Sequence, residues 1–311
     1  MAVTAAMVKE LREMTGAGMM DCKKALAETD GDMEKAVEFL REKGLAGAAK
    51  KAGRIAAEGI VVTAMSDDEK KAVVVEVNAE TDFVAKNEKF QTYAADVAAQ
   101  ALSSTAANMD EFMAEKWQKD ASLTVQEALS SQISIIGENM NIRRYEVVEE
   151  TNGFVASYIH GGGKIGVLVD VETNVVNDAV KEMAKNVAMQ AAALKPLYTS
   201  NDEIDAGYIE KEKEILTAAA KNEKPDANDK IIAGMVMGRI NKQLKEICLL
   251  DQVYVKAEDG KQSVNQYVAE VAKANNASIK VKNFVRFETG EGLEKKEENF
   301  AEEVAKQMGG N

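Results

Sequence analysis

The sequence predicts an α+β protein built from several small modules. Its 311 residues are enough for more than one hydrophobic core, since single cores stop growing at about 250 to 300 residues. Apolar residues recur at helical spacing up to about residue 54 and then change to the period of β-strands. A strand-turn-strand-helix pattern occurs twice, beginning at Gly59 and at Gly153. Together these observations predict a helical N-terminal module followed by antiparallel sheets with helices packed on them.

Residues 1–54 are expected to form three short helices and a linker. The apolar stripes of the helices are Met7, Val8, Leu11 and Met14, then Met20, Ala25 and Leu26, then Met33, Val37 and Leu40. Asp32 is a candidate N-cap for the third helix, and Gly44 is expected to end it in a left-handed conformation. The stretch from Gly44 to Gly59 carries Lys50, Lys51 and Arg54 and is typical of a solvated linker with a basic face.

Residues 55–150 are expected to form the first α+β subdomain of a core. Strands over Ile60 to Val62 and Val73 to Val77 flank a polar turn, which is typical of an antiparallel hairpin. A helix from about Asn87 to Leu102 follows. A polar, helical insertion is expected around Met109 to Ile136, and Ile142 to Val148 supplies another strand.

Residues 151–288 repeat this pattern as a second subdomain. An offset of 92 positions lays nine residues of the first copy over identical residues of the second: Val75, Val77, Glu80, Thr81, Val84, Lys89, Ala99, Ala101 and Leu102. Two such units would share apolar positions even without a duplication. If the duplication is real, a shared position serves the common fold, whereas a residue present in one copy alone is a better candidate for function.

A helical hairpin is expected to interrupt the second subdomain at about residues 199–247. Its two arms should be joined by a turn at Lys224-Pro225. Its apolar residues are Ile204, Ile209, Leu216, Ile232, Val236, Ile240, Leu244 and Ile247. This stripe either packs within its own domain or meets a partner or a second copy, so a homodimer through the hairpin is one possible outcome. Strands are predicted at Gln252 to Lys256 and Ser278 to Phe287, around a helix near Val264 to Asn275. Residues 289–311 should form a C-terminal module with a short charged helix, Leu293 to Met308.

Charge and cysteine content narrow the classes of partner. The net charge of -13 repels a phosphate backbone over most of the surface and disfavours direct contact with nucleic acid. Cys22 and Cys248 lie in no metal-ligand spacing and are expected to be buried free thiols in a reducing compartment. Because no signal peptide or run of about 18 apolar residues is present, the sequence predicts a soluble, cytoplasmic protein that does not engage membranes.

Motifs for catalysis are absent or weak. The segment GGGKIG from Gly161 to Gly166 lacks the spacing of a phosphate-binding loop and falls in a hairpin turn. His160 is the single histidine, which excludes a multi-histidine metal site. We therefore expect no catalytic residue, no metal and no cofactor. The rival hypothesis is an enzyme that uses His160 beside the glycine turn, and detectable turnover of any nucleotide would support it.

The segment Thr81 to Asn87 is the strongest candidate for a binding site. Phe83 stands at the exit of a strand, beside Asp82 and close to the start of a helix. At the offset of 92 positions, Phe83 meets Val175 and Asp82 meets Asn174. The common fold would then require neither side chain. This favours a protruding wedge over the alternative, a plug for the domain's own core.

Five segments together resemble one protein family. They are MTGAGMMDCKKAL at 14–26, ETDFVAKNE at 80–88, IGENMNIRR at 136–144, YIHGGGKIGVLV at 158–169 and VRFETGEGLEKKEENFAEEV at 285–304. In order and over almost the whole chain they are similar to bacterial elongation factor Ts. The resemblance implies a ubiquitin-associated-like three-helix module, a core of two similar antiparallel α+β subdomains, a helical hairpin insertion and a C-terminal helix.

The same resemblance implies a function and a set of contact residues. The family's partner is elongation factor Tu, which it binds in GDP-bound and nucleotide-free forms, and its activity is guanine nucleotide exchange without covalent catalysis. By this resemblance Thr81, Asp82, Phe83 and Val84 would form the motif that displaces Mg²⁺. The other contact residues would be Lys23, Lys24, Ile136, Gly137, His160, Met235 and Val236. The two lysines could instead be ordinary solvated residues, and a purely structural module whose helical head captures a ubiquitin-like tail is a third hypothesis.

Overall fold

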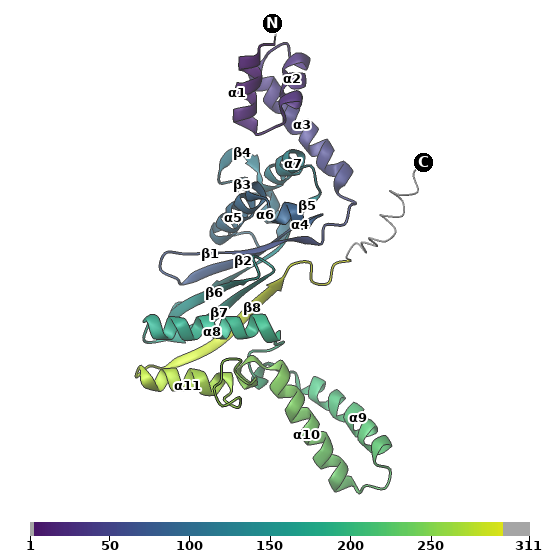
Figure 1. Cartoon of the computed structure of the whole chain (residues 1–311), viewed down its shortest axis with the longest axis vertical. Helices are drawn as coiled ribbons and strands as arrows, with labels where there is room; N and C mark the ends of the chain where they lie inside the picture. The colour runs from purple at the N-terminus through teal and green to yellow at the C-terminus, as the bar shows by residue number, and fades with distance from the viewer. Residues whose placement is uncertain (1–2, 295–311) are drawn as a thin grey trace.

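The computed structural model describes residues 3–294 and confirms the α+β class, with helices packed on two three-stranded antiparallel sheets. Figure 1 shows an elongated molecule, with the N-terminal helices at one end, the sheets in the middle and a helical hairpin at the other end. The predicted charged helix, Leu293 to Met308, lies almost wholly outside the described residues. The N-terminal helices form a small module that we call the head.

The head consists of α1 (Ala5–Thr15), α2 (Met19–Glu28) and α3 (Met33–Lys51). Its core contains Val8, Leu11, Cys22, Ala25, Leu26 and Ala36. Asp32 is the N-cap of α3, as predicted, because its side chain accepts a hydrogen bond from the Lys35 amide at 3.1 Å. The three predicted helices are therefore confirmed.

The predicted end of the third helix at Gly44 is wrong. Helix α3 continues to Lys51, and Gly44 lies inside it, buried against α7 (Val125–Ile136). A Cβ atom placed on Gly44 would lie 3.8 Å from the Ser130 carbonyl oxygen and 3.9 Å from Ser134 Cβ. The glycine thus marks a close approach of two helices, and the alanines and lysines that follow it favour continued helix. The predicted linker shrinks to the few residues between Lys51 and Glu58.

The first unit is a sheet in the order β1-β2-β5, all antiparallel. Its strands are β1 (Glu58–Met65), β2 (Lys71–Ala79) and β5 (Met140–Glu149). Helix α5 (Glu88–Ser103) buries Phe90, Tyr93 and Val97 on one face of the sheet, and the short helix α4 (Asp82–Ala85) precedes it. The hairpin, the helix and the third strand were all predicted.

The insertion between α5 and β5 is only partly helical. It contains α6 (Met109–Ala114), β3 (Lys116–Trp117), β4 (Asp120–Thr124) and α7. The small β3–β4 hairpin was not predicted, because strands of two and five residues are too short to show a clear alternation.

The second unit has the same topology, with strand order β6-β7-β8. Its elements are β6 (Gly153–His160), β7 (Ile165–Thr173), α8 (Asp178–Leu194), α11 (Val264–Ala274) and β8 (Ile279–Glu288). The two sheets pack face to face through Val61, Ala72, Val74, Val148, Val155, Leu168, Val285 and Phe287. Helices α5 and α8 cover the outer faces (Figure 1), so side chains along β2 and β7 alternate between an inner and an outer core.

No single offset relates the two units. Gly59 pairs with Asn78 and Gly153 with Glu172, so the strands correspond at 94 positions. The helix N-caps are Asn87 and Asn177, which correspond at 90 positions. The connection between strand and helix is therefore four residues longer in the first unit, and the extra residues form α4. The residue pairs predicted at an offset of 92 positions, Phe83 with Val175 and Asp82 with Asn174, are wrong.

A buried glutamine occupies the same place in both helices and supports the structural repeat. Gln100 donates to the Lys116 carbonyl and accepts from the Gln118 amide. Gln190 donates to the Val253 carbonyl and accepts from the Val255 amide. The strand predicted at Gln252 to Lys256 is absent, since this segment forms only an isolated bridge between Val253 and Ser263. Its backbone is held by the glutamine instead of a sheet.

The helical hairpin consists of α9 (Ala206–Glu223) and α10 (Asp229–Ile247), with the predicted Lys224-Pro225 turn between them. Two short 3₁₀ helices flank it, η1 (Asn201–Glu203) and η2 (Leu249–Asp251). The apolar stripe is covered within the hairpin, where Ile232, Val236 and Ile240 pack with Ala220. The basis for a homodimer through this stripe is therefore removed.

Cys22 and Cys248 are both buried free thiols, as predicted. Among the residues described, no helix has both the length and the apolar character needed to span a bilayer.

Candidate partner-binding surface

Helix α4 carries the strongest candidate residue, Phe83, on a single helical turn. Thr81 is the N-cap, and its hydroxyl accepts a hydrogen bond from the Val84 amide at 3.3 Å. Val84 and Ala85 are buried against the first sheet and anchor the turn from below. Phe83 points away from this anchor, and 82% of its surface is exposed.

The exposure of Phe83 excludes the alternative that it plugs its own core. Phe90 and Phe112, in the same unit, are fully buried. Burying a phenylalanine stabilises a fold by roughly 1.5 to 3 kcal/mol. The exposed Phe83 does not contribute this free energy to folding. A large exposed aromatic on an anchored turn is a kind of side chain that is enriched at protein interfaces.

Two carboxylates tie α4 to the loop that follows α7. Glu138 accepts hydrogen bonds from the Thr81 amide at 3.0 Å and from the Thr81 hydroxyl at 2.7 Å. In the other direction, Glu80 accepts from the Asn139 amide at 2.5 Å. Gly137 ends α7 with a left-handed φ of 90°, which turns the chain into this loop. The structure thus brings the predicted residues Ile136 and Gly137 beside the Thr81 to Val84 motif.

Asp82 is held as a carboxylate at the edge of this site. A 2.6 Å hydrogen bond from Lys86 lowers the pKa of Asp82, and the charges of Lys86 and of Lys164 act in the same direction. Lys164 also forms a 3.0 Å ion pair with Glu58 at the start of β1. The glycine turn that precedes Lys164 therefore lies near Asp82, although the two segments are far apart in the sequence.

His160 ends β6 at this same turn. Its Nδ1 lies 2.9 Å from the Tyr158 hydroxyl, and the imidazole is exposed. Gly161, Gly162 and Gly163 all have positive φ, and the Gly163 carbonyl accepts from the Val61 amide at 2.7 Å. The turn is thus a tight β-hairpin packed on the first sheet. The described residues include no group of three or more side chains arranged to hold a metal ion.

The remaining predicted residues lie at the two ends of the molecule. Lys23 and Lys24 are exposed on α2 of the head, and Met235 and Val236 are on α10 (Figure 1). Val236 is only 4% exposed, because it packs within the hairpin. Its contact with a partner stays a prediction, and Met235 is partly buried against the same cluster.

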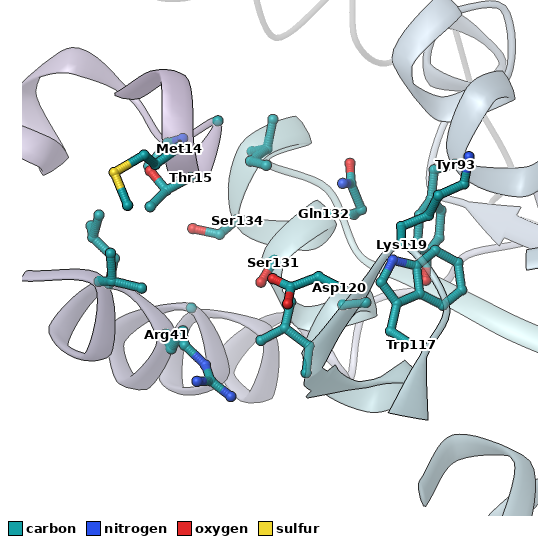
Figure 2. Close-up of a pocket in the computed structure, with 18 of the residues that line it drawn as sticks. Met14, Thr15, Arg41, Tyr93, Trp117, Lys119, Asp120, Ser131, Gln132 and Ser134 are labelled. Carbon is teal, nitrogen blue, oxygen red and sulfur yellow. Dashed lines mark hydrogen bonds between the residues drawn. The ribbon is translucent and has the colours of Figure 1, made fainter. Parts of the chain in front are cut away.

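A cavity of about 620 Å³ lies between the head and the first unit. Figure 2 shows Met14 and Thr15 on one side, Tyr93 and Trp117 on the other, and Ser131 and Ser134 between them. Two ion pairs border it, Arg41 with Glu127 at 3.1 Å and Lys119 with Asp96 at 2.8 Å. None of the predicted site residues lines this cavity. Sequence reasoning missed it because its walls come from elements far apart in the chain.

Sequence reasoning also missed Glu138 and Lys164 as parts of the site. Both lie inside motifs singled out from the sequence, IGENMN and GGGKIG. Their neighbours Gly137 and His160 were named instead. Only the fold shows that Glu138 contacts Thr81 and that Lys164 lies near Asp82.

Comparison with known proteins identifies the family. The family model described as elongation factor TS matches residues 80–291. An elongation factor Ts of Clostridium botulinum (strain Eklund 17B / Type B) is 56% identical over 308 residues, which cover 99% of each chain. One of Clostridioides difficile (strain 630) is 56% identical over 306 residues, 98% of this chain and 99% of the relative. One of Clostridium kluyveri is 53% identical over 309 residues, 99% of each chain. The chain belongs to the elongation factor Ts family of translation elongation factors.

Proposed function

We propose that this protein binds elongation factor Tu and promotes release of its GDP, so that GTP can bind in its place. The observation that carries the proposal is Phe83, which is 82% exposed on a turn held by Thr81, Val84 and Glu138. A side chain in this state is free to enter a partner at once. It needs no rearrangement of its own core.

The proposed mechanism acts on the metal and phosphate contacts of the bound nucleotide. Mg²⁺ requires near-octahedral geometry at about 2.0 to 2.1 Å, so a shift of about 1 Å in the helices that hold its ligands loosens it. Phe83 would produce that shift by entering between helices of the partner's GTPase domain. The free energy of the whole interface would then stabilise the deformed, nucleotide-free partner.

The other proposed contacts extend along the molecule. Lys23 and Lys24 on the head would meet the GTPase domain near its nucleotide site. Ile136, Gly137 and His160 would support the contact around Phe83, and Met235 and Val236 would meet the partner's other domains. We retain the module boundaries 1–54, 55–150, 151–288 and 289–311 as part of this proposal. Within it, the hairpin at about 199–247 is a contact element and not a self-pairing device.

The test is a nucleotide-release assay on elongation factor Tu loaded with a fluorescent GDP analogue. The wild-type chain should accelerate release, and Phe83→Ala should lose most of that acceleration. His160→Ala alone should reduce binding without creating or removing any turnover of nucleotide.

Each rival hypothesis predicts a different result in the same assay. Hydrolysis of nucleotide that disappears in His160→Ala would support an enzyme. Tight binding of the partner with no acceleration of release would support a purely structural module. Acceleration that is unchanged in Phe83→Ala would contradict the role assigned to the exposed phenylalanine.

A further inference from the structure

The loop between α7 and β5 makes two different kinds of contact with the end of β2. The first is shared by both units. Asn139, directly before β5, donates its amide to Glu80, and Ser278, directly before β8, donates its amide to Asn174. Because the strands correspond at 94 positions, Glu80 and Asn174 occupy equivalent places. This contact closes the end of the sheet in each unit and belongs to the common fold.

The second contact occurs in the first unit alone. Glu138 accepts from both the amide and the hydroxyl of Thr81, at 3.0 and 2.7 Å. In the strand correspondence, the positions of Glu138 and Thr81 are taken by Ala277 and Val175 in the second unit. Neither side chain there can form this pair. A charged residue found only beside α4 is therefore not needed to build the sheet.

Thr81 connects Glu138 to the turn that carries Phe83. Its hydroxyl donates to Glu138 and accepts from the Val84 amide at 3.3 Å, as the N-cap of α4. A helix of four residues has almost no hydrogen-bond ladder of its own, so its conformation depends on its cap and its anchor. Fixing the Thr81 hydroxyl on a carboxylate directs its lone pairs toward the Val84 amide.

We infer that Glu138 is a positioning residue that holds Phe83 ready to enter the partner. The inference rests on the proposed exchange function. Glu138 acts through Thr81 and the α4 cap and need not touch the partner. Its contribution is preorganisation, because an exposed aromatic that must be ordered during binding loses part of its contact free energy.

The functional test compares Glu138→Ala with Phe83→Ala, singly and together, in GDP release from elongation factor Tu. Glu138→Ala should lower the maximal release rate by roughly tenfold, the size expected for loss of a charged hydrogen bond, with a smaller change in half-saturating concentration. The double variant should be no slower than Phe83→Ala alone, since both changes remove the same action. Glu138→Gln, which keeps one acceptor for Thr81, should fall between wild type and Glu138→Ala. Asn174→Ala, which removes only the shared sheet-closing contact of the second unit, is a control and should keep the wild-type rate.

A second measurement uses the chain without its partner. Amide hydrogen exchange at Val84 should be faster in Glu138→Ala, while exchange in β2 and β5 should keep its wild-type rate. This measurement does not depend on nucleotide release. Failure of the proposed function would be seen separately, because the wild-type chain would then not accelerate GDP release.

Three results would overturn the inference. The first is an unchanged exchange rate at Val84. The second is a multiplicative loss of GDP release in the double variant. The third is a uniform loss of protection across the first sheet in both Glu138→Ala and Glu138→Gln, which would make Glu138 a structural residue of the fold.

Discussion

Phe83 and Phe90 stand seven positions apart in the sequence but have opposite environments. Phe83 is 82% exposed and Phe90 is fully buried. Comparison of the two copies predicted that Phe83 protrudes, although it paired Phe83 with the wrong residue, Val175. The correct reason is that α4 is an insertion, so the second unit offers Phe83 no counterpart at all.

Replacing each phenylalanine should separate function from stability. Phe83→Ala should change the free energy of unfolding by less than about 1 kcal/mol, because little apolar surface is lost from the core. Phe90→Ala, the matched control, should lose about 3 to 5 kcal/mol through the cavity that it leaves. Thermal or urea unfolding measures both. A loss of several kcal/mol in Phe83→Ala would contradict the exposed position of this side chain.

Each three-stranded sheet has a β-bulge, between Glu76 and Val77 in β2 and between Asp170 and Val171 in β7. An acidic residue is buried beside each bulge. Glu76 in β2 is paired with Arg143 at 3.1 Å and Arg144 at 2.7 Å. Asp170 occupies the equivalent place in β7 but shares Lys282 with a second buried acid, Glu150. Lys282 lies 2.8 Å from Glu150 and 3.8 Å from Asp170. Burial, followed by the hydrogen bond with Glu150, raises the pKa of Asp170, so Asp170 is the acid of this pair that takes up a proton more readily.

The raised pKa of Asp170 predicts the direction in which the free energy of unfolding changes with pH. Between the ordinary pKa of an aspartate and the raised value, the folded state binds a proton that the unfolded state has lost, so stability falls as the pH rises. Asp170→Asn cannot ionise and should not show this fall. The free energy of unfolding of wild type minus that of the variant should decrease by on the order of 1 kcal/mol from about pH 4 to pH 7. An increase over the same range would show that ionised Asp170 stabilises the fold as a partner of Lys282.

At the scale of elements, periodicity located the long helices and strands well. The N-cap Asp32, the start of α5 near Asn87 and the Lys224-Pro225 turn stand where expected. The sequence-based predictions were wrong where a tertiary contact determines the local structure. Gly44 is a packing contact with α7, and the segment after Gln252 is held by a buried glutamine. Neither contact has a local signal in the sequence.

Gly44→Ala tests the revised end of α3. The added Cβ would make ordinary contacts with α7 at 3.8 and 3.9 Å, and alanine favours helix over glycine. The variant should therefore be more stable by about 0.5 to 1 kcal/mol in chemical unfolding. If Gly44 ended the helix in a left-handed conformation, the same substitution would destabilise the protein.

Two neighbouring isoleucines test the packing of the hairpin. Ile232 is 3% exposed and Ile231 is 50% exposed on the same helix, α10. Ile232→Ala should lose about 2 to 4 kcal/mol of hairpin stability, whereas Ile231→Ala should lose less than about 1 kcal/mol. Amide hydrogen exchange in α9 and α10 measures this local stability directly. Equal effects of the two substitutions would mean that the stripe is not packed within the hairpin.

At the scale of the whole molecule, the proposed contacts are spread along the long axis. The head and the hairpin lie at opposite ends of the molecule, with Phe83 on the sheet core between them (Figure 1). The sequence could predict these modules, because each has its own periodicity. It could not predict how they are joined, since the α3–α7 contact and the paired sheets depend on residues far apart in the chain. The role of Glu138 and the cavity between the head and the first unit are therefore visible only in the fold.

We propose that this chain loosens GDP by disturbing the Mg²⁺ site of elongation factor Tu. By linkage, nucleotide must weaken the partner's hold on this chain by the same factor as this chain weakens the nucleotide. The direct measurement is a titration of the preformed complex with GDP, with Mg²⁺ or with a chelator, following dissociation of the two proteins. GDP with Mg²⁺ should dissociate the complex at lower concentration, and Phe83→Ala should reduce the difference between the two conditions. Equal competition with and without Mg²⁺ would contradict the claim.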